Sequence, residues 1–247
     1  MRLAVLSDIH SNLEALEAAK KAVERLGADR IITCGDLVGY NADPNPVVDW
    51  VREEKILAIM GNHDAAACGL EEPVHFNAYA RAAALWTREA LTEENCAFLQ
   101  SLPTQARVGR TVLVVHGSVL ERDAYLFDAA SAGGEFEALR SSYDRVKIAF
   151  FGHTHYAVSF SAGPRGGPVE THHEDAVPLA RGRRYLVNPG SVGQPRDGDP
   201  RLSFVLADLG AGVVERHRVA YRAAEAAAKV RKAGLPEYLA RRLEEGH

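Results

Sequence analysis

VLSDIHSN, residues 5–12, is an apolar run that ends abruptly in polar side chains, and the chain repeats this design four more times. The other stretches are ITCGDLVG (32–39), AIMGNHD (58–64), LVVHGS (113–118) and AFFGHTH (149–155). Apolar runs that alternate with helix-period stretches are typical of βαβ units with parallel strands. Because open parallel sheets carry their functional groups at the carboxyl ends of the strands, we expect the five polar clusters to converge on one rim.

The residues around these clusters predict the secondary structure. We expect strands at 3–6, 30–33, 56–60, 112–115 and 148–151, and helices at about 13–26 and 47–52. The last two strands are continuously apolar, so both of their faces should be covered, and we expect helices on either side. From Ala157 onward, short strand-like runs broken by Gly and Pro predict a second sheet, mixed or antiparallel.

Two helical segments lie outside this alternation. Residues 70–103 are rich in Ala, Leu and Glu and predict a helical cap beside the sheet, in which Asn77 can serve as a helix N-cap. Residues 223–247, with a break at 234–236, predict a tail of two surface helices. The length demands no more than one hydrophobic core, so we expect a single domain over residues 1–247.

The composition excludes several classes of protein. Of the 247 residues, 47% are hydrophobic and 25% charged, as in folded globular proteins, and no apolar run reaches the about 18–20 residues of a membrane span. The net charge of −4 argues against an extended nucleic-acid footprint but leaves small nucleotide substrates open. The three cysteines form no CxxC pattern, which favours a reducing cytoplasm over a disulfide framework or a thiolate metal site.

The polar clusters supply oxygen and nitrogen donors of the kind that bind Mn, Fe or Zn. These donors are Asp8, His10, Asp36, Asn62, His63, Asp64, His116, His153 and His155. Residues two apart on an extended segment point the same way, so Asp8 and His10 can offer two ligands toward one place. The same argument applies to His153 and His155. Taken singly, each buried His or Asp is more often a hydrogen-bonded structural residue than a ligand.

The ordered set of clusters resembles the calcineurin-like metallophosphoesterases, and the order makes the resemblance specific. Their DxH, GDxxG, GNHD, later H and GHxH signature matches Asp8/His10, Gly35/Asp36/Gly39, Gly61–Asp64, His116 and Gly152–His155. The stretch VNPGSVGQPRDGDPR (187–201) is similar to the bacterial and archaeal small phosphoesterase branch. The resemblance implies a four-layer α/β/β/α sandwich of two mixed sheets, whereas the sequence pattern alone supports only α/β with a parallel component.

The resemblance also implies two divalent ions per chain, manganese first, with iron, zinc, nickel or cobalt as alternatives. Their implied ligands are Asp8, His10, Asp36 and His155 for one ion, and Asp36, Asn62, His116 and His153 for the other. Asp36 would bridge the two ions, and a hydroxide held by the metals would be the nucleophile.

Further residues have expected roles in substrate binding and proton transfer. His63 is left free to contact the phosphate or to protonate the leaving oxygen, and we expect Asp64 to orient it. Asn62 and Arg196 are the expected substrate-binding residues, since a guanidinium fork matches phosphate oxygens. For Arg196 a simple polar turn in QPRDGDPR explains the sequence equally well.

The function expected from these residues is metal-dependent hydrolysis of a small phosphoester or nucleotide. Phosphodiesters are the first choice, and phosphomonoesters or nucleotide polyphosphates are the alternative. A noncatalytic nucleotide sensor on the same scaffold would have lost a ligand or the acid, and neither is lost here. A redox iron enzyme would need open metal positions instead of a shared carboxylate pair. Homo-oligomerisation is left open.

Overall fold

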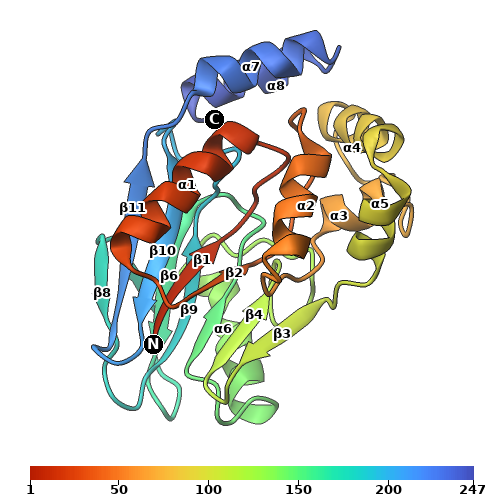
Figure 1. The fold of residues 1–247 in the computed structure, drawn as a ribbon. Helices are drawn as coiled ribbons and strands as arrows, with labels where there is room; N and C mark the ends of the chain where they lie inside the picture. Colours follow the sequence, from red (N-terminus) through yellow and green to blue (C-terminus); the bar gives the residue numbers. More distant parts are fainter.

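Eleven strands and eight helices make up the computed structural model, which describes residues 1–247 (Figure 1). One sheet has the order β2 (Arg30–Thr33), β1 (Arg2–Leu6), β10 (Leu202–Asp208), β11 (Val213–Val219), β8 (Ala176–Pro178). The other has the order β3 (Gln105–Val108), β4 (Val112–Val115), β5 (Ile148–Phe150), β9 (Arg184–Pro189), β6 (Ala157–Ala162), β7 (Glu170–His172). None of the helices combines the length and apolar character needed to cross a lipid bilayer.

Both sheets are mixed, as the family resemblance predicted. Strand β1 pairs in parallel with β2, and β5 pairs in parallel with both β4 and β9, while the remaining pairs are antiparallel. The strand pattern alone was misleading, because the strands after Ala157 complete both sheets instead of forming a separate one. Strand β10 joins β1 through pairs such as Arg2 with Asp208, a long-range contact that local periodicity does not encode.

Four layers result from the way each sheet buries both of its faces. Leu3 and Val5 of β1 lie in the core between the sheets with Phe150, whereas Ala4 and Leu6 face helices α1 (Leu13–Leu26) and α2 (Pro44–Glu53). Helix α6 (Ala129–Ser141) covers the outer face of the second sheet. The expectation of helices on both sides of β4 and β5 is therefore wrong. Their second face is covered by the other sheet, which gives the same continuous apolar pattern.

The expected strand at 56–60 is also wrong. Only Leu57 forms a bridge, to Ile32, and the backbone N–H of Met60 donates to the carbonyl of Pro103 at 2.8 Å. The segment is paired at one residue only, which is too short a length to form a strand, and Gly61 already caps helix α3 (Asn62–Ala67).

The predicted cap and tail are both helical. The cap contains α4 (Ala78–Ala90) and α5 (Glu93–Gln100), and the side chain of Asn77 accepts from the first backbone N–H groups of α4, as expected of an N-cap. The tail contains α7 (Ala223–Lys232) and α8 (Glu237–Glu245), which lie beyond α1 at one end of the molecule (Figure 1).

The tail is packed against the body of the protein. Its apolar residues share a buried cluster with Tyr40, which follows the second motif, and with Ala80 and Ala83 of α4. A common core across tail, cap and motif loop is what a single folding unit requires. We therefore propose that residues 1–247 form one domain.

Candidate metal centre

The loops that leave β1, β2, β4 and β5 meet at one end of the two sheets. Backbone hydrogen bonds tie these loops directly to one another: the N–H of Asp8 donates to Gly35 O at 3.1 Å, that of His10 to Asp36 O at 3.0 Å, and that of Gly152 to His116 O at 2.6 Å. The five polar clusters thus converge as expected, although the rim that they form belongs to two sheets and not to one.

Five of the site residues have left-handed backbone conformations. Their φ angles are 52° for Asp8, 47° for His10, 52° for Asp36, 65° for His153 and 60° for His155. Such residues cost about 1–3 kcal/mol each and persist where the surrounding structure enforces them, typically at functional sites. The motif segments are therefore turns and not the extended segments assumed from the sequence.

This turn geometry corrects one expectation about the spacing of the ligands. Asp8 and His10 do lie on the same side, but His153 and His155 separate. His155 Nε2 lies 3.5 Å from Asp8 Oδ1, whereas His153 joins Asp36 and His116. The HTH segment therefore serves two places, because left-handed residues abolish the two-residue alternation of a strand.

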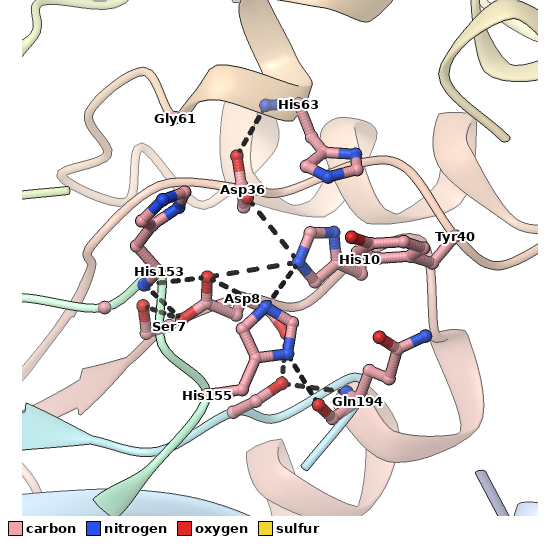
Figure 2. Close-up of polar contacts among 12 residues, drawn as sticks. Ser7, Asp8, His10, Asp36, Tyr40, Gly61, His63, His153, His155 and Gln194 are labelled. Atoms are coloured by element: carbon pink, nitrogen blue, oxygen red, sulfur yellow. Dashed lines mark hydrogen bonds and ion pairs between the residues drawn. The ribbon is translucent and has the colours of Figure 1, made fainter. Parts of the chain in front are cut away.

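The converging side chains form two buried groups, each with three donor atoms that lie within 4.8 Å of one another. One group is Asp8, His10 and His155, and the other is Asp36, His116 and His153. All six residues are at most 6% exposed. Figure 2 shows Asp8 and His10 of the first group directed toward His155, which comes from another loop.

The carboxylate of Asp36 connects the two groups. Its Oδ2 lies 3.5 Å from His10 Nε2, and its Oδ1 accepts a 2.9 Å hydrogen bond from the backbone N–H of His63 (Figure 2). The same Oδ2 lies 3.4 Å from His116 Nε2. One carboxylate oxygen thus lies between one histidine of each group. This is the position that a carboxylate bridging two cations would occupy.

Three histidines are oriented by backbone carbonyls. The Nδ1 atoms of His10, His116 and His155 lie 2.9, 2.8 and 2.6 Å from the carbonyl oxygens of Val38, Cys34 and Gln194, respectively. A carbonyl only accepts, so each of the three Nδ1 atoms carries a proton. In the neutral rings of His10 and His155 this leaves the lone pair on Nε2, which is directed into the centre.

The first group has the donor chemistry of a cation site. The Nε2 atoms of His10 and His155 are 3.0 Å apart, and with both Nδ1 atoms protonated, two lone pairs face each other. Burial lowers the pKa of both rings well below the ordinary value, which keeps them neutral. In the second group, His153 Nε2 is buried without a hydrogen-bond partner. Imidazole lone pairs and buried carboxylates at this spacing fit divalent metal ions.

Charge is unevenly distributed over the two carboxylates. Burial opposes ionisation of Asp36, but His116 and its other histidine neighbours hold the pKa of this carboxyl well below its usual range. Burial likewise opposes charge on His116, yet Asp36 raises the pKa of this imidazole to about 10. For Asp8, burial raises the pKa to about 7. A cation beside Asp8 would favour its ionised form, so metal binding and proton release are coupled there.

Two motif glycines make room for the carboxylates. A Cβ atom on Gly61 would lie 2.0 Å from Asp36 Oδ1, and one on Gly152 would lie 2.0 Å from Ser7 Oγ and 2.6 Å from Asp8 Oδ2. No side chain fits at these distances. The glycines of the GNHD and GHTH motifs are therefore required by close packing against the aspartates.

Asn62 and His63 lie beside the second group, at the start of α3. Asn62 Oδ1 is 3.0 Å from His116 Nε2. The ring of His63 packs against Tyr40 and Phe76, with centroid distances of 4.4 and 4.6 Å, and its Nδ1 is buried without a hydrogen-bond partner. Burial lowers the pKa of His63 to about 4, against the pull of Asp36, so the ring is neutral.

Asp64 does not orient His63 as expected. Its carboxylate accepts hydrogen bonds from the backbone N–H groups of Val38, at 3.1 Å, and Gly61, at 3.0 Å. Asp64 therefore holds the second and third motif loops together, and the packing of aromatic rings positions His63 instead.

Arg196 reaches the centre from the loop after β9. Its Nη2 donates to the hydroxyl of Tyr40 at 3.1 Å and to Gln194 Oε1 at 3.2 Å, and the guanidinium lies 5.4 Å above the Tyr40 ring. It has no ion pair with a carboxylate, in contrast to many other arginines of the chain. A guanidinium without an acidic partner beside a polar centre is available to an anion.

The sequence profile of the "Calcineurin-like phosphoesterase superfamily domain" matches residues 1–212. The chain belongs to the calcineurin-like phosphoesterase superfamily. An uncharacterized protein of Methanocaldococcus jannaschii is 36% identical over 246 residues, which are 98% of this chain and 96% of that protein. This similarity extends through the α7–α8 tail, beyond the residues that the superfamily profile matches.

Solved structures agree with this assignment. A metallophosphoesterase from Sphaerobacter thermophilus is 37% identical, with a TM-score of 0.84 over 100% of both chains. A hypothetical protein from Pyrococcus horikoshii has the same fold, with a TM-score of 0.81 at 19% identity over 100% of this chain and 98% of that one. The calcineurin-like fold, including the cap and the tail, is thus shared over whole chains.

Residues outside the five superfamily motifs complete the centre, and little in the sequence indicates their roles. The hydroxyl of Ser7 donates to Asp8 Oδ2 at 2.6 Å, that of Ser191 donates to Asp8 O at 2.8 Å, and the carbonyl of Gln194 fixes His155. Ser191 and Gln194 belong to the stretch 187–201, whose resemblance to small phosphoesterases was the available signal.

Proposed function

We propose that this chain hydrolyses phosphoesters with two divalent metal ions and prefers phosphodiesters. The observation that carries the proposal is the position of Asp36, whose Oδ2 lies between His10 of one buried Asp/His group and His116 of the other. Two separate structural clusters would not need a shared buried carboxylate.

The side chains that would hold the ions are those of the two groups, with Asn62 added. Asp8, His10, Asp36 and His155 would bind one ion, and Asp36, Asn62, His116 and His153 the other. Manganese is our first choice, with iron, zinc, nickel or cobalt as alternatives. Two such ions, when bound, supply a water of lowered pKa and neutralise the charge of a phosphoryl group during in-line displacement.

The chain itself supplies a proton donor and an anion-binding group. As water adds to phosphorus, the bond from phosphorus to the leaving oxygen breaks, and that oxygen needs a proton. We propose that His63 provides it. The negative charge of a bound phosphate would raise the pKa of the buried imidazole, so that the ring is protonated in the complex, and its Nδ1 has no partner within the protein. Arg196 would bind a non-bridging phosphate oxygen, supported by its hydrogen bonds to Tyr40 and Gln194.

The preference for diesters follows from the charge around the centre. No lysine lies on the motif loops, and Arg88 of the cap is already paired with Glu72 at 2.9 Å. Apart from the ions, Arg196 is the cation of the loops at the centre that is not paired with a carboxylate. A monoester dianion carries one more negative charge than a diester and is favoured by additional cations.

We therefore expect kcat/KM for bis(p-nitrophenyl) phosphate to exceed that for p-nitrophenyl phosphate by about tenfold, the effect of one charge-assisted contact of about 1.4 kcal/mol. Both substrates are measured with Mn-loaded protein at one pH. A clear preference for the monoester would make phosphomonoester hydrolysis the better description. Binding of both compounds without turnover would favour the noncatalytic sensor.

A second candidate, hydrolysis of nucleotide polyphosphates, is supported by an arginine of the tail. The carbonyl of Gly246 accepts from Gly198 N at 2.9 Å, which holds the end of α8 against the loop that follows Arg196. Burial and then the positive charge of Arg196 lower the pKa of Arg242 on α8. Two mutually repelling guanidinium groups would bind a second phosphate of the same substrate, so a nucleoside diphosphate belongs in the same kinetic comparison.

Two metal ions per chain are expected after loading with Mn. Seven side chains would make eight ligand contacts, and a single ion would leave one buried Asp/His group without a counter-charge. Elemental analysis of the loaded, fully active protein measures the stoichiometry. Full activity with one ion per chain is incompatible with the two-metal mechanism.

A further inference from the structure

Three exposed aromatic side chains lie beside the second Asp/His group, and we call Tyr125, Phe127 and Tyr156 the aromatic platform. They are 51%, 56% and 44% exposed. The rings of Tyr125 and Phe127 are nearly parallel, at 5°, with centroids 5.6 Å apart, and Tyr156 meets Phe127 edge to face at 6.2 Å. Grouped exposed aromatic rings on a protein surface commonly mark a binding site.

The platform adjoins the metal centre. The ring of Tyr125 lies 4.1 Å from that of His153, whose Nε2 is the unpartnered donor of the second group. On the other side, Phe127 and Tyr156 line a cavity of about 740 Å³, which is within the usual range for small-ligand pockets. The platform therefore runs from the metal centre into a space large enough for part of a substrate.

The loop that carries Tyr125 and Phe127 is anchored to the body of the protein. The buried carboxylate of Glu135 on α6 accepts from the backbone N–H groups of Val119, at 2.6 Å, and Leu120, at 3.3 Å. Arg122 forms a bidentate pair with Glu71, with distances of 2.8 and 2.7 Å. A surface held in place before binding loses less conformational entropy when a ligand arrives.

We propose that the aromatic platform binds the base of a nucleotide ester whose phosphate lies at the metal centre. This inference rests on the proposed phosphoesterase function and names its substrate class. The sugar of a nucleotide separates its base from its phosphate, so a phosphate beside His153 places the base beyond Tyr125, over Phe127. A base offers a flat, uncharged face to these rings, and base–aromatic stacking tolerates any base.

The kinetic test compares two diesters with the same leaving group, thymidine 5′-(p-nitrophenyl phosphate) and methyl p-nitrophenyl phosphate. With Mn-loaded protein we expect kcat/KM to favour the thymidine ester by about tenfold, a typical effect of stacking one base. In Phe127→Ala this ratio should fall toward one. Phe127 is mostly exposed, so its removal costs little folding stability.

Tyr79→Ala is the matched control for this test. Tyr79 is 45% exposed and packs on another aromatic ring, that of Tyr238 at 4.6 Å, but it lies on α4 of the cap. This variant should keep the wild-type ratio. Equal kcat/KM for the two esters in the wild type, or an unchanged ratio in Phe127→Ala, would overturn the proposal. Phenyl p-nitrophenyl phosphate provides a further comparison. If its kcat/KM exceeds that of the methyl ester by as much as that of the thymidine ester does, the platform binds simple aryl esters instead.

A binding measurement separates failure of the platform from failure of the proposed activity. Calorimetry with Mn-loaded protein compares adenosine 5′-monophosphate with ribose 5-phosphate, which lacks the base. We expect the adenosine compound to bind about tenfold more tightly, and Phe127→Ala to remove this difference. If neither diester is hydrolysed, the proposed function fails while this comparison still decides whether a base is bound. Equal affinities in the wild type would overturn the platform.

Discussion

Asp36→Asn is expected to lower kcat by roughly 10³-fold, and by more than Asp8→Asn does, because several kcal/mol of charge stabilisation depend on the shared carboxylate. Asp36 Oδ2 contacts His10 and His116 of the two separate groups, at 3.5 and 3.4 Å. The carboxylate of Asp8 lies with one group only, where Ser7 and the backbone N–H of His153 also contact it. Loss of the Asp8 charge should weaken the binding of one ion and leave the other ion in place.

The two substitutions form a matched pair. Both aspartates are buried and both have a φ of 52°, a conformation that asparagine also tolerates, so any backbone effect is similar in the two variants. The measurement is kcat at saturating Mn, with the metal content determined on the same samples. Comparable residual rates in the two variants would remove the bridging assignment of Asp36.

His63→Ala is expected to keep both metal ions and to lose about 10²–10⁴-fold in turnover on diesters with poor leaving groups, the usual contribution of one general acid. The side chain is not part of either Asp/His group, and its Nδ1 is buried without a partner. With p-nitrophenolate the loss should be much smaller, because this anion departs without a proton. The measurement is kcat across a series of leaving groups of increasing pKa.

Phe76→Ala provides the control for His63. The Phe76 ring packs on the imidazole with centroids 4.6 Å apart and carries no proton to donate. Its removal should lower the rate modestly and by the same factor for every leaving group. If His63→Ala also shows equal losses for good and poor leaving groups, the role of His63 is phosphate binding or positioning, and the general acid must be sought elsewhere.

Local sequence patterns predicted the elements whose formation depends on near neighbours. The helix at 13–26 and the strands at 30–33 and 112–115 were placed at their observed bounds, and Asn77 was recognised as an N-cap. These features follow from apolar periodicity and from capping chemistry within a few residues. The prediction of a strand at 56–60 failed. Its apolar run has the pattern of a strand, but a strand also needs a hydrogen-bonded partner along its length, and here only one bridge forms.

The contacts made by individual site residues were harder to predict. Asp64 was expected at His63, but its carboxylate bonds to the backbone of Val38 and Gly61. Arg242, 46 positions after Arg196 in the sequence, stands in no motif that predicts a role for it, although in the folded chain the charge of Arg196 lowers its pKa. Such contacts depend on which loops meet, and loop conformations such as the left-handed turns at Asp8 and His153 leave no periodic signal.

The sequence by itself determined the family of this protein and the identity of the donors, because five polar clusters in a fixed order specify a set of side chains whatever the path of the chain between them. Only the tertiary structure decided how these donors are divided between the two Asp/His groups. Pairing of β10 with β1 assigned β1 and β4 to different sheets, and left-handed residues directed His153 and His155 to different groups. The aromatic platform was likewise invisible in the sequence, since exposed rings become a surface only when a loop is anchored beside the centre. The chemistry of each donor depends only on its residue type, whereas the distances between donors far apart in the sequence depend on the whole fold.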